Sequence, residues 1–551
     1  MSGTSVFAAL ERAAATNRTI RVIEHADSSL DISYTTLRDE ALAIGGGLAA
    51  RGIAPGARVA LVFPEVADFI RGFFGIAAAG LVPVPLFPPA QAGDLATFTK
   101  QSQHILDASH AAAVITSGDV APLLDVRGLA APPAVIAIDV LHEGPALQTG
   151  VPVAMDAPAL LQFTSGSTAA PKGVVLSHTA IEANSLAIHY GLDLRPDDVG
   201  VSWLPLYHDM GLIGMLVAGV YGCVNLVMMS PVQFLKRPSV WLDAISRYRG
   251  TISFAPNFAY ELCLRRVKTS QVEALDLSSW RVAGCGAEPV RAETLRAFAE
   301  HFAPSGFKPS AFLPSYGLAE HSLAVTFAKG GLKVDVVDAG ILNRESRAIP
   351  VVNGSPSVKI VNCGQPFPGH EVRIVDDQGQ ALPDRHVGRI VARGPSVMNG
   401  YFENPEATAQ ALDGGWLHTG DLGYMAAGCL HVCGRTKDLI IRQGKKYHPP
   451  DLESSIASMQ GVRPSAVVVF GITKTAEADQ VIAVLEARAS STSDDISEHV
   501  RRRVRETSGL EIDHVVVTPP GTIPRTTSGK VRRAETRARF TAGTLLSGRG
   551  A

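Results

Sequence analysis

The chain has 551 residues and a mass of 58.1 kDa, which is too long for one hydrophobic core, so we expect several folding units. Hydrophobic residues make up 46% and charged residues 19%, and the net charge of -2 gives no general attraction to nucleic acid or to a membrane surface. The six cysteines lack the spacing of a zinc site or a disulfide framework, and the first residues lack the pattern of a signal peptide. These features favour a cytoplasmic protein that binds no nucleic acid.

The first part of the chain alternates between helical and strand-like patterns. Apolar residues recur at helical spacing from Leu37 to Leu48, residues 58–63 form a strand-like run, and a second helical stretch ends at Gly80. Residues 101–150 repeat the pattern with one helix and two strands. This alternation predicts α/β layers with parallel strands.

Residues 160–178 combine two apolar runs with a loop that is rich in glycine and hydroxyl groups. The loop residues are Thr164, Ser165, Gly166, Ser167 and Thr168, and Pro171-Lys172-Gly173 follow them. Backbone N–H and side-chain O–H groups can converge on an anion there, and Lys172 adds a positive charge, as in a phosphate cradle. The loop is not a Walker A sequence, because Pro171 replaces a glycine and no Ser or Thr follows Lys172. Taken alone, it could also be an ordinary surface loop.

The next segments are strongly apolar. Residues 210–231 carry no charge and are long enough to cross a membrane, but several glycines interrupt them. We interpret them as a buried helix, a glycine break and a buried strand, and we expect no stable membrane insertion. Just before them lies His208, in the loop SWLPLYHDMG. Aromatic residues between positions 228 and 263 could form core or line a slot for an acyl chain, and the composition does not separate these readings.

Two later loops carry groups that suit a nucleotide. The sequence WRVAGCGAEP, residues 280–289, predicts a strand that ends in a loop, and Pro289 rules out a dinucleotide fingerprint. The sequence PSYGLAE, residues 314–320, places Tyr316 and Glu320 around one turn. An aromatic ring can stack on adenine, and a carboxylate can hold Mg²⁺ together with phosphate oxygens.

The last third of the chain changes in character. Residues 328–362 form a long connector whose Val/Ile alternation predicts short strands or a hairpin. Asp421 lies in a glycine-flanked turn, where a lone aspartate usually caps backbone N–H groups. Charged residues then replace the apolar alternation, and residues 439–523 predict a small α/β domain. The basic sequence PRTTSGKVRR, residues 524–533, would ordinarily be a solvated face.

In their order along the chain, these motifs resemble those of the adenylate-forming superfamily, and the resemblance covers nearly the whole sequence. It implies an α/β fold with a large multi-layer N-terminal adenylation domain, residues 1–434, and a small mobile α/β C-terminal domain, residues 435–551, after a hinge at Lys437. One departure is Ala169, where many members have glycine. Alanine tolerates most loop conformations but not an obligatory positive φ.

The resemblance also implies roles for individual residues. Lys530 bridges the substrate carboxylate and the α-phosphate, His208 lies beside the reacting carboxylate, and Glu320 holds Mg²⁺ with Thr168 as a second metal ligand. The implied ATP- and AMP-binding residues are Thr164, Ser165, Gly166, Ser167, Thr168, Lys172, Gly286, Ala287, Ser315, Tyr316, Gly317, Leu318, Asp421 and Arg435. The implied acyl-pocket residues are Trp203, Met229, Phe254, Asn257, Phe258 and Gly284.

Three features resemble the fatty acyl-AMP ligase branch: the string PVPLFPP at residues 83–89, the apolar segments between residues 203 and 263, and the long connector. In that branch the connector is an insertion thought to restrain domain movement. The resemblance implies ATP and Mg²⁺ as cofactors, and a fatty acid and an acyl carrier protein with a phosphopantetheine arm as partners, for example in lipid or polyketide biosynthesis. An acyl-CoA synthetase that uses free CoA is the alternative, against which the connector speaks. An inactive acyl-nucleotide-binding scaffold is a third, against which intact Lys530, Glu320, Asp421 and Arg435 speak.

Overall fold

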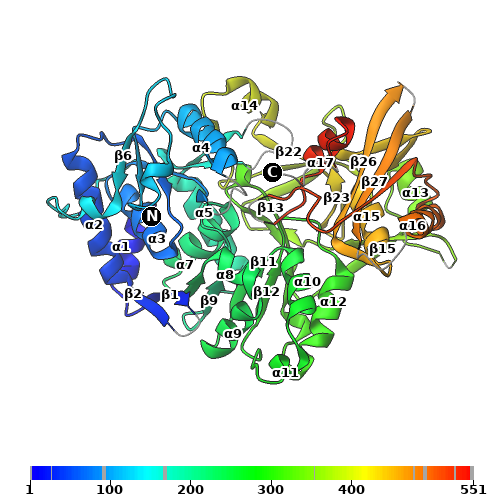
Figure 1. Cartoon of the computed structure of the whole chain (residues 1–551), viewed down its shortest axis with the longest axis horizontal. Coiled ribbons are helices and arrows are strands. Elements are labelled where there is room, and N and C mark those ends of the chain that lie inside the picture. The colour runs from blue at the N-terminus through cyan, green and yellow to red at the C-terminus, as the bar shows by residue number, and fades with distance from the viewer. Residues whose placement is uncertain are drawn as a thin grey trace.

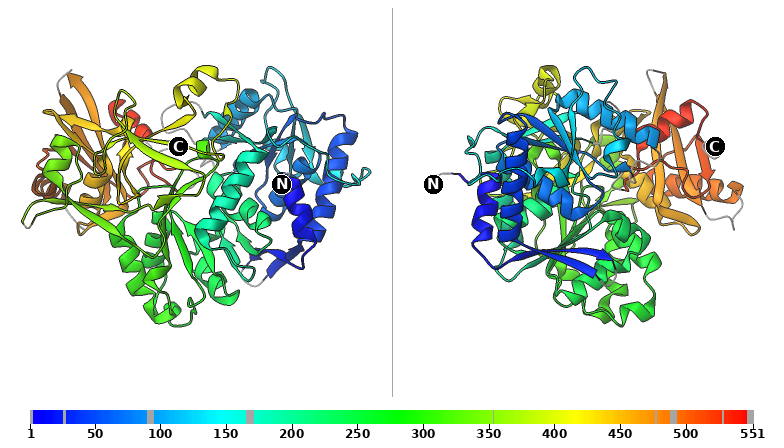
Figure 2. Two further views of the ribbon diagram at one scale, coloured as in Figure 1. Left: turned by 180° about the vertical axis from the view of Figure 1, so that it is seen from behind. Right: turned by 60° about the vertical axis from the view of Figure 1, so that its left-hand side comes forward.

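The computed structural model describes residues 3–25, 28–89, 95–164, 171–352, 354–475, 478–487, 493–526 and 529–545. Its blue-to-yellow part, the large body (residues 3–434), makes up most of the molecule. The orange-to-red part, the small body (residues 435–545), lies against one end of it (Figures 1 and 2).

An all-parallel sheet of order β4-β3-β5-β6 forms the N-terminal layer, as the alternating pattern predicted. Its strands are β3 (Arg58–Val62), β4 (Val82–Pro85), β5 (Ala113–Thr116) and β6 (Ala134–Ala137), and the helices of this region are α1 (Val6–Ala14), α2 (Tyr34–Ala50), α3 (Val66–Ala78) and α4 (Leu95–Ser109). Helices α2 and α3 meet closely, since a Cβ at Gly75 would lie 2.3 Å from Cγ2 of Ile44.

A nine-stranded sheet of order β17-β14-β13-β12-β11-β9-β10-β1-β2 lies at the centre of the large body. Its strands are β1 (Thr19–His25), β2 (Ser28–Ser33), β9 (Val199–Ser202), β10 (Asn225–Met229), β11 (Ile252–Ala255), β12 (Val282–Cys285), β13 (Phe312–Gly317), β14 (Ala324–Phe327) and β17 (Gln365–Pro366). Within this order, the neighbouring strands of the stretch β13-β12-β11-β9-β10-β1 are parallel to one another. The loops after β9, β11, β12 and β13 therefore leave the sheet at the same edge.

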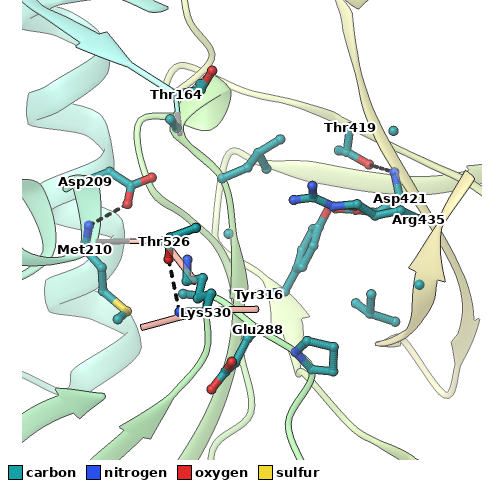
Figure 3. A pocket seen from close by; sticks show the side chains of 18 of the residues that line it. Thr164, Asp209, Met210, Glu288, Tyr316, Thr419, Asp421, Arg435, Thr526 and Lys530 are labelled. Atoms are coloured by element: carbon teal, nitrogen blue, oxygen red, sulfur yellow. Dashed lines mark hydrogen bonds and ion pairs between the residues drawn. The ribbon is translucent and has the colours of Figure 1, made fainter. Parts of the chain in front are cut away.

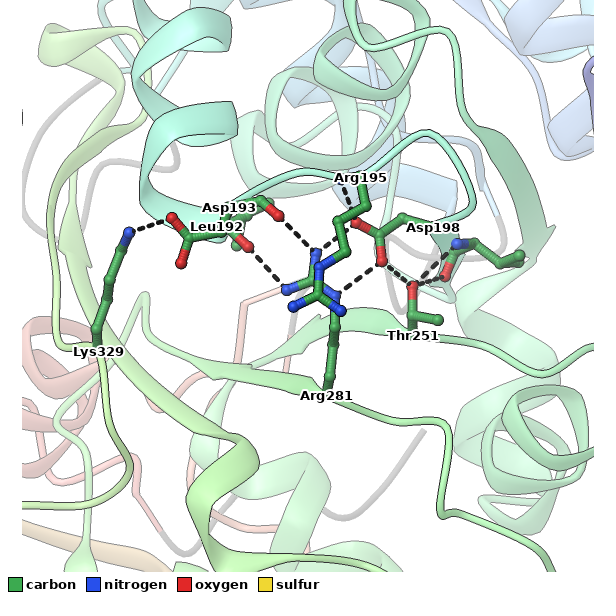
Figure 4. Close-up of polar contacts among 8 residues, drawn as sticks. Leu192, Asp193, Arg195, Asp198, Thr251, Arg281 and Lys329 are labelled. Atoms are coloured by element: carbon green, nitrogen blue, oxygen red, sulfur yellow. Dashed lines mark hydrogen bonds and ion pairs between the residues drawn. The ribbon is translucent and has the colours of Figure 1, made fainter.

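A buried ion pair fixes the opposite edge of this sheet (Figure 4). Asp198, Thr251 and Arg281 immediately precede β9, β11 and β12, and Arg281 Nε donates to Asp198 Oδ1 at 2.8 Å while Thr251 Oγ1 donates to the same oxygen at 2.7 Å. Burial alone would raise the pKa of Asp198, but Arg281 and the other donors hold it below its ordinary value. The amino ends of three strands are thus tied together away from the loops at the other edge.

Helices cover both faces of this sheet. They are α5 (His178–Leu192), α6 (Asp209–Gly211), a π-helix (Leu212–Val217), α7 (Ala218–Tyr221), α8 (Pro231–Lys236), α9 (Ser239–Arg247), α10 (Asn257–Arg266), α11 (Thr269–Val272) and α12 (Ala292–His301). The uncharged residues 210–231 form short helices followed by strand β10, which confirms their interpretation as buried segments. Among the helices of the described ranges, none is long and apolar enough to cross a membrane.

The predicted phosphate loop joins two strands of a small sheet. Its strands are β7 (Pro158–Phe163), β8 (Gly173–Ser177) and β20 (Gly400–Tyr401), in the order β20-β8-β7. The two apolar runs that flank the loop form strands β7 and β8, and β20 brings a distant segment beside β8.

The long connector packs on a further sheet of the large body. That sheet contains β18 (Glu371–Val375), β19 (Gly388–Arg393), β21 (Leu412–Asp413), β22 (Trp416–Ala426) and β23 (Cys429–Arg435), and helix α14 (Pro405–Ala411) lies beside β21. The connector forms an antiparallel pair, β15 (Val334–Asp338) and β16 (Ser357–Val361), joined by α13 (Ala339–Glu345). The short strands were predicted, and the helix was not. Asp335 fastens this insertion, since it accepts hydrogen bonds from Tyr424 Oη at 2.8 Å and Arg385 Nη1 at 2.9 Å.

The small body has its own sheet and core. Its elements are β24 (Ile440–Arg442), β25 (Lys445–Tyr447), α15 (Pro449–Ala457), β26 (Val462–Thr475), β27 (Ala478–Ala487), α16 (Ser493–Ser508), β28 (His514–Thr518) and α17 (Arg533–Thr541). Ile440, Leu452 and Val469 belong to a core formed within this part of the chain. We therefore propose the domain boundary between residues 434 and 435, with Lys437 in the short 3₁₀ helix that follows as the hinge. Helix α13 of the insertion lies beside β25 and α16.

Candidate active site

A cleft of about 1400 Å³ lies where the small body meets the large one. Its wall on the large body comes from the loops after β9, β11, β12 and β13 and from residues 418–421 of strand β22. On the small body, Arg525, Thr526 and residues 530–534 line the opposite wall. Figure 3 shows side chains from both bodies pointing into the same space.

One end of the cleft holds Tyr316, Asp421 and Arg435. The Tyr316 hydroxyl donates to Asp421 Oδ2 at 2.7 Å, and Arg435 Nε lies 3.5 Å from Asp421 Oδ1 (Figure 3). Thr419 Oγ1 accepts the Asp421 backbone N–H at 3.2 Å, and both residues lie within strand β22, so Asp421 does not lie in the turn that the sequence predicted. Burial raises the pKa of Asp421, and the nearby Arg435 guanidinium and Tyr316 hydroxyl oppose that rise. An aromatic ring, a hydrogen-bond acceptor and a cation together suit a nucleoside.

The loop after β12 closes this end. Gly286 is needed there, because a Cβ at this position would lie 2.4 Å from Ser315 Oγ on the neighbouring strand. Ala287 follows with φ of 67°, a left-handed conformation that turns the chain toward the cleft. The cleft is lined by Ala287, Ser315, Gly317 and Leu318, whereas Gly286 is buried behind them.

The other end of the cleft joins the phosphate loop to the predicted metal carboxylate. Tyr401 on β20 is the link: its hydroxyl donates to Glu320 Oε1 at 2.8 Å, and the Lys172 ammonium lies 4.8 Å from the centroid of its ring. Thr164 N–H donates to the Lys172 carbonyl at 3.0 Å. Four of the predicted loop residues lie outside the described residues: Ser165, Gly166, Ser167 and Thr168.

Glu320 offers one oxygen ligand of the kind that Mg²⁺ takes, although the described residues contain no cluster of three His, Cys, Asp or Glu side chains that could hold a metal ion. Glu320 lines the cleft, and a carboxylate is the hard oxygen ligand that this ion prefers. Tyr401 engages Oε1 and so orients the carboxylate. Thr168, the second predicted ligand, lies outside the described residues, so the metal role of both residues stays a prediction.

Lys530 reaches the centre of the cleft from the small body. Its Nζ lies 3.4 Å from Nε2 of His208, and Nδ1 of His208 lies 2.6 Å from Asp209 Oδ1. Desolvation lowers the pKa of Lys530, while the carboxylates of Asp209 and Glu288 raise it and the Arg435 cation lowers it further. A cation therefore stands beside an imidazole in the cleft that Arg435 and Lys172 also line.

The loop that carries Lys530 rests on the large body. A Cβ at Gly529 would lie 2.7 Å from Cζ of Phe258, so the glycine lets the backbone pack directly on that ring. Arg291 of the large body donates from Nη1 to the Pro464 carbonyl of the small body at 2.5 Å. These contacts hold the two bodies together around the cleft.

The predicted acyl-pocket residues divide into two groups. Phe254, Asn257 and Phe258 line the cleft. The other three are buried behind its wall in the described structure: Trp203 is 1% exposed and stacks on Phe234 at 3.9 Å between ring centroids, and Met229 is 1% exposed within β10. Gly284 lies under the Phe254 ring, where a Cβ would come within 2.1 Å of it. These three positions support the wall and do not form its surface.

The cleft is also lined by apolar residues that the sequence patterns did not single out: Ile188, Met210, Gly214, Leu323 and Phe327. The predicted Phe254 belongs with them, since its ring centroid lies 5.6 Å from that of Phe327. Gly214 belongs to the π-helix, a rare local structure that often marks functional sites, and a Cβ there would lie 2.6 Å from Leu323 Cδ2. The glycines within residues 210–231, which spoke against a membrane helix, could have indicated this close approach between Gly214 and Leu323. Asp209, Glu288 and Tyr401 were also missed, because their contacts join distant segments.

Comparison with known proteins identifies the family. The profile of the AMP-binding enzyme family matches residues 10–402, and that of the Disco-interacting protein 2-like AMP domain matches residues 437–548. A Caulobacter vibrioides protein named as an acyl-CoA synthetase is 39% identical over 93% of this chain and 91% of its own length. The medium-chain-fatty-acid–acyl-carrier-protein ligase JamA of Moorena producens is 33% identical over 93% of this chain and 90% of its own length.

The fold gives the same result. A structure from a study of fatty acyl-adenylate ligases from E. coli and L. pneumophila superposes with a TM-score of 0.91 and 35% identity, covering 98% of each chain. The chain therefore belongs to the AMP-binding enzymes of the adenylate-forming superfamily, in the fatty acyl-AMP ligase branch.

Proposed function

We propose that this enzyme activates a fatty acid with ATP to form acyl-AMP and pyrophosphate, and then passes the acyl group to the phosphopantetheine thiol of an acyl carrier protein. The observation that carries the proposal is the position of Lys530, which lies beside His208 in the same cleft as Tyr316, Asp421, Arg435 and Lys172.

The chemistry of adenylation explains why a buried cation is needed. A carboxylate is a poor electrophile, so its oxygen attacks the α-phosphate of ATP, an acyl–phosphate anhydride forms, and pyrophosphate leaves. Two anions must meet, and charge develops on the phosphoryl oxygens, so fixed cations supply most of the stabilisation. We assign Lys530 to bridge the carboxylate and the α-phosphate, with His208 beside the carboxylate.

The two ends of the cleft position the nucleotide in this proposal. Tyr316, Asp421 and Arg435 bind the adenosine, and Lys172 binds the phosphates from the opposite end. Mg²⁺ bound at Glu320 would neutralise charge on the leaving pyrophosphate. Because Tyr401 contacts both Lys172 and Glu320, we assign it to keep the phosphate loop and the metal carboxylate at a fixed separation.

The apolar lining supports a fatty acid as the substrate. Met210, Gly214 and Leu323 line the same cleft as His208 and Lys530, so an acid whose carboxylate lies at Lys530 could place its alkyl chain against apolar side chains. Burying an alkyl chain contributes about 0.8 kcal/mol per CH₂ group, which favours a chain of several carbons over acetate.

Transfer to a carrier protein is supported by the relatives and by the insertion. The Moorena producens relative is named for ligation to an acyl carrier protein. Helix α13 of the insertion lies against the small body, which is the part that must move between two half-reactions. We also propose a cytoplasmic location, since the cysteines are free thiols.

A product assay separates carrier loading from CoA loading. The enzyme is incubated with ATP, Mg²⁺ and a medium-chain fatty acid, with CoA in one reaction and a phosphopantetheinylated carrier protein in another. We expect acyl-AMP to persist with CoA and to be consumed by the carrier. Rapid formation of acyl-CoA would contradict carrier specificity and favour the acyl-CoA synthetase alternative.

A further inference from the structure

The contacts of His208 determine which of its ring nitrogens carries the proton. Nδ1 of His208 and Oδ1 of Asp209 are 2.6 Å apart, a distance that requires a proton between them. The Met210 backbone N–H also points here, but it is 2.7 Å from Asp209 Oδ1 and 3.4 Å from His208 Nδ1, so the carboxylate accepts it. The carboxylate thus takes both hydrogen bonds, and Nδ1 of His208 is a donor.

The other ring nitrogen faces Lys530. With Nδ1 protonated, neutral imidazole has a lone pair on Nε2, and Lys530 Nζ lies 3.4 Å from it. An ammonium has only donors, so this contact can form only with the lone-pair form of Nε2. The opposite tautomer would place an N–H against the ammonium and break the contact.

We infer that Asp209 is a positioning residue for adenylation: its carboxylate holds the His208 ring with Nδ1 protonated, so that Nε2 accepts a hydrogen bond from the Lys530 ammonium. Asp209 side-chain exposure is 12%, so the carboxylate that accepts the Nδ1 proton is largely shielded from solvent. The inference deepens the proposed function and rests on it. The Asp209 carboxylate acts through His208 and has no assigned contact with the substrate.

Asp209 also affects the charge on Lys530. The charged and titratable groups that face Lys530 are His208 and Asp209 at α6, Glu288 after β12, and Arg435 at the end of β23. Asp209 itself faces His208 and Lys530, and these two hold its pKa below the ordinary value despite burial. Removing its negative charge should lower the pKa of Lys530, so the ammonium would be lost at a lower pH.

The test compares Asp209→Asn with the wild-type enzyme in acyl-AMP formation across pH. We expect kcat to fall about ten- to a hundredfold, the effect of losing a charge-assisted hydrogen bond, with little change in the KM for ATP. We also expect the alkaline limb of the profile to move down by roughly one pH unit. The control is Asp243→Asn, an exposed carboxylate on α9 outside the cleft, which should leave the profile unchanged.

A double-mutant cycle and a direct measurement complete the test. In a His208→Gln background, Asp209→Asn should cost little further activity, since Asp209 acts through the ring. In wild-type enzyme labelled with ¹⁵N-histidine, with His208→Gln assigning the signal, Nδ1 should be the protonated nitrogen.

A His208 ring protonated on Nε2 would overturn the inference about Asp209 but not the proposed function. The same holds for an Asp209→Asn pH–activity profile that keeps the wild-type alkaline limb. A wild-type enzyme that forms no acyl-AMP would overturn the proposed function as well. The NMR measurement needs no Asp209 variant, so its result stands even where Asp209→Asn folds poorly.

Discussion

At the scale of single residues, Asp451 differs from the other carboxylates of the cleft. It is half-buried in the first turn of α15, and Glu453, two residues later, is engaged by Arg533 at 2.9 Å. Burial raises the pKa of Asp451 to about 8, and the Glu453 charge adds to the rise. From roughly pH 4 to pH 8 the folded chain therefore keeps a proton that the unfolded chain has released, so the free energy of unfolding falls as pH rises through this window.

The Asp451→Asn variant tests this protonation. Asparagine resembles the protonated acid, so the variant should match the wild type near pH 4 and be more stable by about 1 to 3 kcal/mol at pH 8. Denaturant unfolding at several pH values measures the difference, and the exposed Asp119→Asn serves as the control. A stability difference that does not change with pH would contradict the protonation assigned to Asp451.

The resemblance of local motifs to the adenylate-forming superfamily was enough to select the principal side chains of the cleft. Tyr316, Asp421 and Lys530 were predicted in this way, and the structure brings all three to one cleft. Asp209 and Glu288 could not be selected in this way, because their importance comes from the approach of Lys530 from another part of the chain. The resemblance assigned Trp203 to the acyl pocket, but a sequence motif does not distinguish a residue on the pocket surface from one in the core layer behind it.

At the scale of elements, the parallel strands were predictable because their apolar runs are short, buried and bounded by breaks. The register at the amino edge of the central sheet depends on Arg281 and Asp198, which lie 83 positions apart and show no local pattern. Helix α13 was missed because seven residues between two strands give too short a window for helical periodicity.

The loop before Lys530 gives a test at the element scale. Gly529 and Gly521 both have φ of 88°, so alanine carries a similar backbone cost of about 1 kcal/mol at either position. A Cβ at Gly521 meets open space, whereas one at Gly529 meets Phe258 at 2.7 Å. Gly529→Ala should therefore displace the loop and slow ATP–pyrophosphate exchange at least about tenfold, while Gly521→Ala stays near the wild-type rate. Equal rates in the two variants would show that the Phe258 contact does not position the loop.

At the scale of the whole molecule, the cleft is complete only where the two bodies meet. Lys530 and Arg525 come from the small body, and Glu288 and His208 from the large one. Arg291 donates across the same junction to the Pro464 carbonyl. The arrangement couples catalysis to the relative position of the bodies, since any movement that separates them removes the cation from the reacting groups.

The Lys530→Ala variant tests whether this cation makes the cleft an adenylating site. Acyl-AMP and pyrophosphate would be quantified with ATP, Mg²⁺ and a fatty acid, and ATP binding would be measured separately. We predict a loss of acyl-AMP formation of at least about a hundredfold with ATP affinity within a few-fold of wild type, because the nucleoside and phosphate ends remain intact. Lys446→Ala, an exposed lysine of the same body, should retain full activity. Near-normal acyl-AMP formation by Lys530→Ala would contradict the mechanism proposed for this cleft.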